Sequence, residues 1–244
     1  MKKNSWTIIY HTADSSVCPH IHHSFYEKSN PSANILYADG REYFLPTPYH
    51  SKKVKNINLG VEIDFSKMAR QDSREDELRN TMIHNHDKFL RDWIKDNIHK
   101  ITTNNVAFFE WDVLLNKELP LTRIEGLHFW NALPPGHSMV WGDDILNRVK
   151  DVETLVSPFA GFYTNKDFIE QMISDKYDYL YEQDIFCEVR ISILAHLTGV
   201  KPETNREIFN QPNPLKKPES LNREYKNKDK VPIGCFHPIK QKII

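Results

Sequence analysis

Two carboxylates one residue apart, Glu110 and Asp112, form the pair in this chain whose types and spacing could most directly do chemistry. They stand near the carboxyl end of an apolar run, residues 106–115, that indicates a buried strand. Alternate side chains of a strand point to one face, so we expect Glu110 and Asp112 to project together, away from Trp111. Such a pair either holds a hard divalent ion together with substrate phosphates, or is a strand end whose acids face water.

A second pair, Asp184 and Glu188, has the spacing that places two side chains on one face of a helix. Residues 184–197 are apolar nearly all round, which is typical of a buried helix, and Gly199 stands where a helix-ending glycine is expected. A buried carboxylate near a helix start can serve as a general base. Two interpretations stay open: a helix cap and an ordinary ion pair, or a catalytic base, which the apolar neighbours favour for Glu188.

The histidines give weaker signals. The three histidines in residues 20–23 lack a second His or Cys group at zinc-like spacing, so a solvated loop is the better interpretation. His86 falls on the buried stripe of an expected helix and is predicted to be a core histidine, while Asp87 beside it could face a site. His237 precedes a proline that keeps it extended, and its role is either structural or that of a ligand for phosphate or metal.

Length and composition limit the classes of function. With 244 residues and 39% hydrophobic content, the chain can bury one substantial core, and we expect a single domain over residues 1–244. A formal net charge of -1 gives no electrostatic case for nucleic acid as a partner. The sequence shows no signal-peptide core and no apolar run long enough for a transmembrane segment. Three scattered cysteines suit a reducing cytoplasm, and Cys187 is expected to be a small buried hydrophobe.

The elements that must position these residues alternate as in an α/β fold. We expect strands at residues 5–10 (ending at His11 and Thr12), 34–37, 57–63, 106–115 and 159–163. We expect helices at residues 20–33, 74–100, 167–174 and 184–197. The apolar stripe of the second helix consists of Leu78, Met82, His86, Leu90, Trp93 and Asn97/Ile98. Residues 126–144 are expected to be loop, and residues 201–232 a flexible excursion or lid. Together they predict a mostly parallel central sheet flanked by helices.

In this order, the pieces resemble a bacterial glycosyltransferase of the GT-A type that uses a nucleotide sugar. The resemblance rests on short segments: residues 7–12, Phe109-Glu110-Trp111-Asp112, residues 157–163, Asp184-x-x-x-Glu188 with Gly199, and Phe236-His237-Pro238. It implies a single Rossmann-like GT-A domain with a long carboxyl-terminal loop or lid. It also implies a metal ion, Mn²⁺ or Mg²⁺, at the nucleotide-sugar diphosphate.

The resemblance assigns roles residue by residue. The acid-x-acid motif that holds the diphosphate and metal falls on Glu110 and Asp112, and the carboxyl-terminal histidine of that site falls on His237. The catalytic base for the acceptor hydroxyl falls on Glu188, with Asp184 as second choice. The nucleotide pocket would be lined by His11, Thr12, Asp39, Asp87, Glu110 and Trp111. Glutamate at the first acidic position departs from the usual aspartate, so metal-independent activity remains an open alternative.

The implied activity moves a sugar from a nucleotide-sugar donor to a glycan or lipid-linked acceptor, as in polysaccharide biosynthesis. The departing diphosphate develops negative charge that a cation must neutralise, and the acceptor hydroxyl needs a base. Peripheral contact with the inner face of the membrane is compatible with a lipid-linked acceptor. Two other classes stay open: a metal-dependent phosphohydrolase or nucleotidyltransferase, and a non-catalytic protein that binds nucleotides or carbohydrates.

Overall fold

The computed structural model describes residues 6–12, 23–39, 54–56, 61–63, 86–110, 113–129, 161–182, 187–204 and 234–236. Within them, the largest sheet has six strands in the order β2-β1-β5-β8-β7-β9. These are β2 (Asn34–Asp39), β1 (Trp6–Thr12), β5 (Asn105–Glu110), β8 (Gly161–Asn165), β7 (Leu127–Phe129) and β9 (Pro202–Thr204). β8 is antiparallel to both of its neighbours, and the remaining pairs are parallel. The prediction of an α/β fold with a mostly parallel sheet is confirmed.

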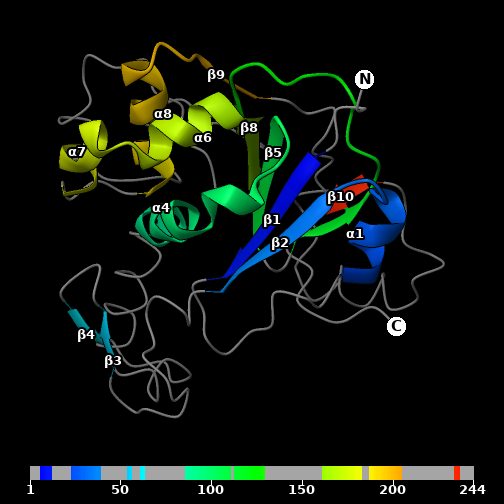
Figure 1. Ribbon diagram of the computed structural model, residues 1–244, viewed down its shortest axis with the longest axis horizontal. Coiled ribbons are helices and arrows are strands. Elements are labelled where there is room, and N and C mark those ends of the chain that lie inside the picture. The colour runs from blue at the N-terminus through cyan, green and yellow to red at the C-terminus, as the bar shows by residue number, and fades with distance from the viewer. Residues whose placement is uncertain are drawn as a thin grey trace, which may run out of the picture.

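β1 lies between β2 and β5 and is parallel to both (Figure 1). The chain passes from β1 to β2 on one side and later returns to β5 on the other, so the strand order reverses at β1. In open α/β sheets, ligands bind outside the carboxyl ends of the strands at such a reversal. The register brings Thr12 opposite Asp39 and His11 opposite Glu110, at the carboxyl ends of these three strands.

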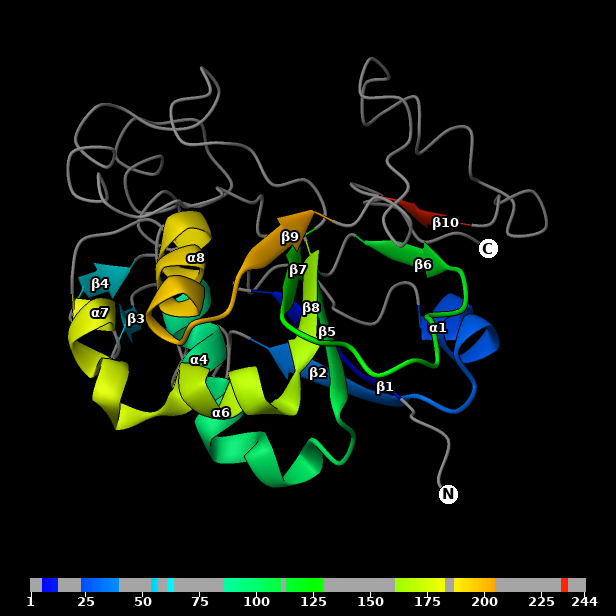
Figure 2. The same ribbon diagram turned by 90° about the horizontal axis from the view of Figure 1, so that it is seen from above.

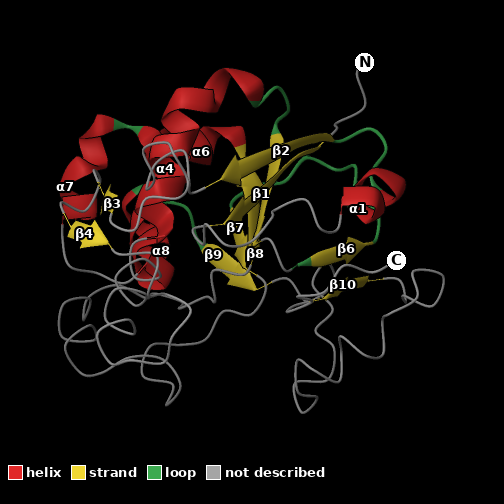
Figure 3. Ribbon diagram, turned by 90° about the horizontal axis from the view of Figure 1, so that it is seen from below, coloured by secondary structure: helices red, strands yellow, loops and turns green. Residues whose placement is uncertain are grey.

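Helices cover one face of the sheet, and a smaller layer covers the other (Figures 2 and 3). The helices are α4 (His86–Asn97), α6 (Lys166–Ile173), α7 (Asp178–Glu182) and α8 (Cys187–Leu197), with short 3-10 turns η2 (Ile98–Lys100) and η3 (Asp175–Tyr177). The smaller layer holds α1 (His23–Ser29) and the antiparallel pair β6 (Leu114–Asn116) and β10 (Gly234–Phe236). A separate pair, β3 (Val54–Asn56) and β4 (Val61–Ile63), forms a hairpin.

The alternation of side chains assigns each strand residue to one of these two layers. Ile9 and Phe108 belong to the core cluster of the helices, whereas Tyr10 and Phe109 belong to the cluster with α1 and β6. His11 is two residues beyond Ile9, and Glu110 is two residues beyond Phe108. Period two therefore turns both polar side chains toward the helical layer, at its edge.

The apolar run over residues 106–115 is not one strand, and that prediction is wrong. β5 ends at Glu110, the Val113 amide donates to the Glu110 carbonyl at 3.0 Å, and β6 then pairs with β10 in another sheet. An i to i+3 hydrogen bond is typical of a turn, so the period-two argument holds only as far as Glu110. Trp111 and Asp112 lie outside the described residues, and their shared face with Glu110 stays a prediction.

Several other elements match their predictions within the described residues. α4 covers the second half of the expected helix 74–100, and the stripe residues His86, Leu90, Trp93 and Asn97 are buried. Cys187 is buried, as expected, and Gly199 ends α8 with φ 73°. β7 lies within residues 126–144, which were expected to be loop, and that prediction is wrong there. β9 lies within residues 201–232, which were expected to be a flexible excursion or lid, and that prediction is wrong for residues 202–204. Residues 205–233 are outside the described part.

The boundary between β8 and α6 depends on Asn165, whose side chain accepts a hydrogen bond from the Phe168 amide at 2.9 Å. No helix in the described part of the chain is long and apolar enough to cross a membrane. The assignment of residues 1–244 to a single domain stays a prediction.

Asn165→Ala removes the helix cap, and we expect it to lower the free energy of unfolding by about 1 kcal/mol. Urea denaturation followed by circular dichroism measures this loss. Asn165→Asp is the control, because it keeps an oxygen acceptor at the start of the helix and loses only the long contact from Asn165 Nδ2 to the Ile124 carbonyl at 3.4 Å, so it should cost less. An equal loss in both variants would show that the cap is not the stabilising contact.

Candidate functional site

The candidate site lies at the carboxyl edge of β2, β1 and β5. Glu110 ends β5 with a side chain that is 27% exposed, so its carboxylate reaches solvent at this edge. His11 lies opposite it on β1 and is fully buried. Thr12 and Asp39 end their strands as register partners, although their side chains are not described. The structure thus brings four of the predicted nucleotide-pocket positions to one edge.

A chain of polar contacts runs from β1 through α4 to β5. The His11 Nδ1 and His86 Nε2 atoms are 2.9 Å apart, with the rings nearly perpendicular, and the other His86 nitrogen, Nδ1, is 3.9 Å from the Glu110 Oε1 atom. His86 also stacks on Phe89 of the same helix. His86 is therefore a core histidine, as predicted, that also contacts the edge of the candidate site.

A fully buried ion pair stands next in the chain to His86. The Arg190 Nη1 atom of α8 donates to the Asp87 Oδ1 atom of α4 at 2.5 Å, and neither side chain reaches solvent. The Arg190 guanidinium also lies 5.6 Å from the centre of the Tyr181 ring. The pair joins α4 to α8, because breaking it would leave an uncompensated charge in the core. Asp87 has no solvent-facing surface, and its predicted nucleotide contact stays untested.

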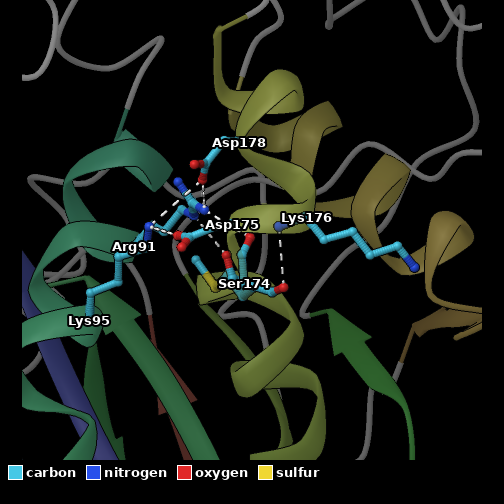
Figure 4. A network of polar contacts seen from close by, with 7 residues as sticks. Arg91, Lys95, Ser174, Asp175, Lys176 and Asp178 are labelled. Atoms are coloured by element: carbon cyan, nitrogen blue, oxygen red, sulfur yellow. Dashed lines mark hydrogen bonds and ion pairs between the residues drawn. The ribbon is translucent and has the colours of Figure 1, made fainter.

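Arg91, one turn further along α4, connects this helix to the carboxyl end of α6 and to α7. Its guanidinium donates to the Met172 carbonyl at 2.8 Å and the Ser174 carbonyl at 3.0 Å, and forms an ion pair with Asp178 (Figure 4). Lys95 adds a bond of 2.8 Å to Asp175. A hollow of about 240 Å³ beside this junction is lined by Lys88, Arg91, Asp92, Lys95, Asp178, Tyr181 and Glu182. These contacts fix the helix that presents His86.

Burial shifts the pKa values of the groups at this edge. It lowers the pKa of His86 below its ordinary value, although the Glu110 charge opposes the shift. It lowers the pKa of His11 further, with a smaller contribution from His86 in the same direction. Burial also raises the pKa of Asp87, while the Arg190 guanidinium opposes that change. Both imidazoles are therefore neutral at pH 7.

The other predicted site residues cannot be placed in this geometry. Asp112, Trp111, Asp184 and His237 lie outside the described residues, as does the side chain of Glu188 in the first turn of α8. In the described part of the chain, no three His, Cys, Asp or Glu side chains are arranged to hold a metal ion. The predicted Mn²⁺ or Mg²⁺ site, which combines Glu110 with Asp112 and His237, therefore stays a prediction.

Sequence reasoning missed two residues of this region, His86 as a neighbour of Glu110 and Arg190 as the partner of Asp87. A signal was available for Arg190, because it is the one arginine of a largely apolar helix. A charge in that position requires a buried partner. No comparable signal pointed to His86, since its contact with Glu110 depends on how α4 docks on the sheet.

No protein-family model and no curated protein sequence matches this chain. Solved structures resemble it over most of its length. One is a glycosyltransferase involved in the glycosylation of the major capsid of PBCV-1, with 9% identity, a TM-score of 0.43, and coverage of 98% of this chain and 96% of that chain. Two are structures of LgtC, an active-site mutant with 13% identity and a TM-score of 0.45, and the galactosyltransferase with donor and acceptor sugar analogues, with 12% identity and a TM-score of 0.44. Each covers 95% of this chain and 86% of LgtC.

These neighbours include glycosyltransferases, the class that the sequence resembles. At identities of 9 to 13% and TM-scores of 0.43 to 0.45, the likeness does not assign an activity or a ligand to this chain.

The buried ion pair gives a prediction of stability. Asp87→Asn and Arg190→Met each remove one half of this buried ion pair, so each should lower the free energy of unfolding by about 3–5 kcal/mol. The double variant Asp87→Asn with Arg190→Met removes both charges and should cost clearly less than the sum of the two single changes. Urea denaturation of the three variants tests this, and additive losses would contradict it.

The buried histidines give a prediction of pH dependence. Their folded pKa values lie below the ordinary value of 6.5, so the unfolded chain binds more protons when the pH falls below that value. The stability that depends on neutral imidazoles is complete above about pH 6.5 and is lost as the pH falls through the lowered pKa values. Melting temperatures measured between pH 7.5 and 5.5 should decline less in His86→Asn than in the wild type. The exposed His196 supplies the control, because His196→Gln should keep the wild-type slope.

Proposed function

We propose that this protein is a glycosyltransferase that uses a nucleotide-sugar donor. One observation carries the proposal: an acidic side chain, Glu110, reaches solvent at the carboxyl edge of parallel strands, where the strand order reverses at β1. The sequence supports it, because Asp112 follows Glu110 at acid-x-acid spacing, as in the enzymes that the chain resembles. We rest the proposal on these residues and not on the distant likeness to solved structures.

The proposal divides the chemistry between two groups of residues. Glu110 and Asp112, with His237, bind the donor diphosphate or its metal. The oxygen ligands of the two acids fit Mn²⁺ or Mg²⁺, which would neutralise the charge on the leaving diphosphate. Glu188 takes the proton of the acceptor hydroxyl as that oxygen attacks the anomeric carbon, and Asp184 is the second choice for this role. Thr12, Asp39 and Trp111 line the nucleotide pocket, with the buried side chains of His11 and Asp87 behind them.

The ion pair between Asp87 and Arg190 supports a shared site for these two groups. Arg190 lies two residues after Glu188 on α8, and Asp87 directly follows His86, whose ring faces Glu110. The helix that carries the proposed base is therefore tied to the helix that borders the acidic edge. The first turns of α8 also carry the positive end of the helix dipole, which favours a carboxylate at Glu188.

The acceptor in this proposal is a glycan or a lipid-linked sugar, at the cytoplasmic face of the membrane in the second case. Thermal-shift measurements with nucleoside diphosphates, with and without Mn²⁺, identify the donor nucleotide first. Nucleotide sugars carrying that nucleotide are then incubated with candidate acceptors, and the products are followed by mass spectrometry. Turnover that releases inorganic phosphate or pyrophosphate, without a glycosylated product, would contradict the proposal.

Asp112→Asn and Glu188→Gln should each abolish sugar transfer while the protein stays folded, because each change removes a charge used in the reaction. Initial rates of product formation and melting temperatures are measured side by side. Asp167→Asn and Glu203→Gln are matched controls, since both side chains are mostly exposed and lie on α6 and β9. Turnover like that of the wild type in either test variant would remove the assigned role.

A further inference from the structure

The contact between His11 and His86 has a definite direction. Two imidazole nitrogens 2.9 Å apart need one donor and one acceptor, so at least one of these rings is neutral and its tautomer is fixed. Either His11 Nδ1–H donates to His86 Nε2, or His86 Nε2–H donates to His11 Nδ1. The two arrangements differ in what the remaining nitrogen of a neutral His86, Nδ1, presents to Glu110.

The Glu110 carboxylate decides between the two arrangements. Its Oε1 atom is 3.9 Å from His86 Nδ1, which is close enough for electrostatic attraction and slightly beyond hydrogen-bond distance. If His86 carried its proton on Nε2, the Nδ1 lone pair would face the negative oxygen. If the proton is on Nδ1, an N–H dipole faces the carboxylate, and His86 Nε2 accepts from His11. The arrangement in which His11 Nδ1–H donates to His86 Nε2 is favoured, because both contacts of His86 are then attractive.

We propose that His86 is a positioning residue for the Glu110 carboxylate, and that His11 holds His86 in the required tautomer. The direction of the chain is His11 Nδ1–H to His86 Nε2, and His86 Nδ1–H toward Glu110 Oε1. This inference rests on the proposed function, in which Glu110 acts at the donor diphosphate or its metal. His86 touches no substrate and acts through Glu110, as an outer group that orients a ligand carboxylate.

The fixed position of α4 makes this role possible. The first turn of the helix is held by the Asp87–Arg190 pair, and the next turn by Arg91 and its carbonyl partners. His86 itself is 7% exposed and stacks on Phe89, so its ring has little room to move. A rigid N–H aimed at Glu110 selects one orientation of that carboxylate among those open to a partly exposed side chain.

Two amide substitutions separate the two nitrogens of His86. The side-chain amide of Asn reaches the place of Nδ1, so His86→Asn can keep a donor facing Glu110 and loses the contact with His11. The longer amide of Gln reaches the place of Nε2, so His86→Gln can keep the contact with His11 and loses the donor. We expect His86→Gln to raise the KM for the donor about 10–100-fold. The donor KM of His86→Asn should stay within a few-fold of the wild-type value. The KM for the acceptor should be unchanged in both variants.

A double-mutant cycle with Glu110→Gln tests whether the effect passes through Glu110. In that background, adding His86→Gln should change the donor KM by less than about 2-fold, because the carboxylate to be oriented is gone. The positioning role is overturned if the increases in donor KM caused by His86→Gln and Glu110→Gln multiply in the double variant. It is also overturned if His86→Asn raises the donor KM as much as His86→Gln does. His128→Gln is the matched control: His128 Nδ1 faces Glu203 Oε2 at 3.7 Å on β7 and β9, and its loss should leave the donor KM unchanged.

A spectroscopic measurement on the wild-type protein needs neither activity nor a folded variant. Long-range ¹H–¹⁵N correlation at pH 7.5 reports which nitrogen of each imidazole carries the proton, and His11 and His86 are expected to carry it on Nδ1. A proton on Nε2 of His86 overturns the inference. Absence of transfer with every donor would overturn the proposed function instead, while the tautomers would still decide the proposed direction of the contacts. If sugar transfer occurs but the effects of His86→Gln and Glu110→Gln on the donor KM multiply, the proposed function is retained and the positioning role of His86 is rejected.

Discussion

The parallel register of β1 and β5 is the constraint on which the candidate site depends. It sets His11 opposite Glu110, and period two turns both side chains toward the helical layer. A slip of β1 by one residue against β5 would exchange the two faces of β1 and place Tyr10, in place of Ile9, beneath the helices. Because both faces of these strands are buried, such a slip would also disrupt both core clusters. The register is thus fixed by the packing of apolar residues, and the polar edge follows from it.

Polar groups buried at this edge link the sheet to two helices. His11 and His86 contact each other, and Asp87 pairs with Arg190, so these contacts offset part of the cost of burying the four side chains. These contacts are costly to break, because an imidazole or a carboxylate that lost its partner would remain buried in an apolar environment. The start of α4 is consequently held in one place. A partly exposed carboxylate such as Glu110 therefore faces a rigid helix end on one side and solvent on the other.

The sequence pattern was sufficient to predict features that are determined within a single helix. The stripe of α4 and the glycine that ends α8 are local signals, and the structure confirms both of them. The run over residues 106–115 failed because apolar residues suit a strand before a turn and a strand after it equally well. The site was predicted only in part for a related reason. Glu110 could be placed at a strand end, but its contact with His86 depends on residues 24 positions apart in the chain.

The lone arginine of α8 shows how composition carries information that periodicity lacks. A helix that is apolar nearly all round has no preferred face, so its pattern does not say which side meets α4. The Arg190 charge reduces that ambiguity, because a buried guanidinium requires an acid and Arg190 pairs with Asp87 of α4. The same pairing fixes how α8 is rotated about its own axis. It therefore constrains where every side chain of the first turns can point, including the proposed base, and joins the stability of the core to the arrangement of the site.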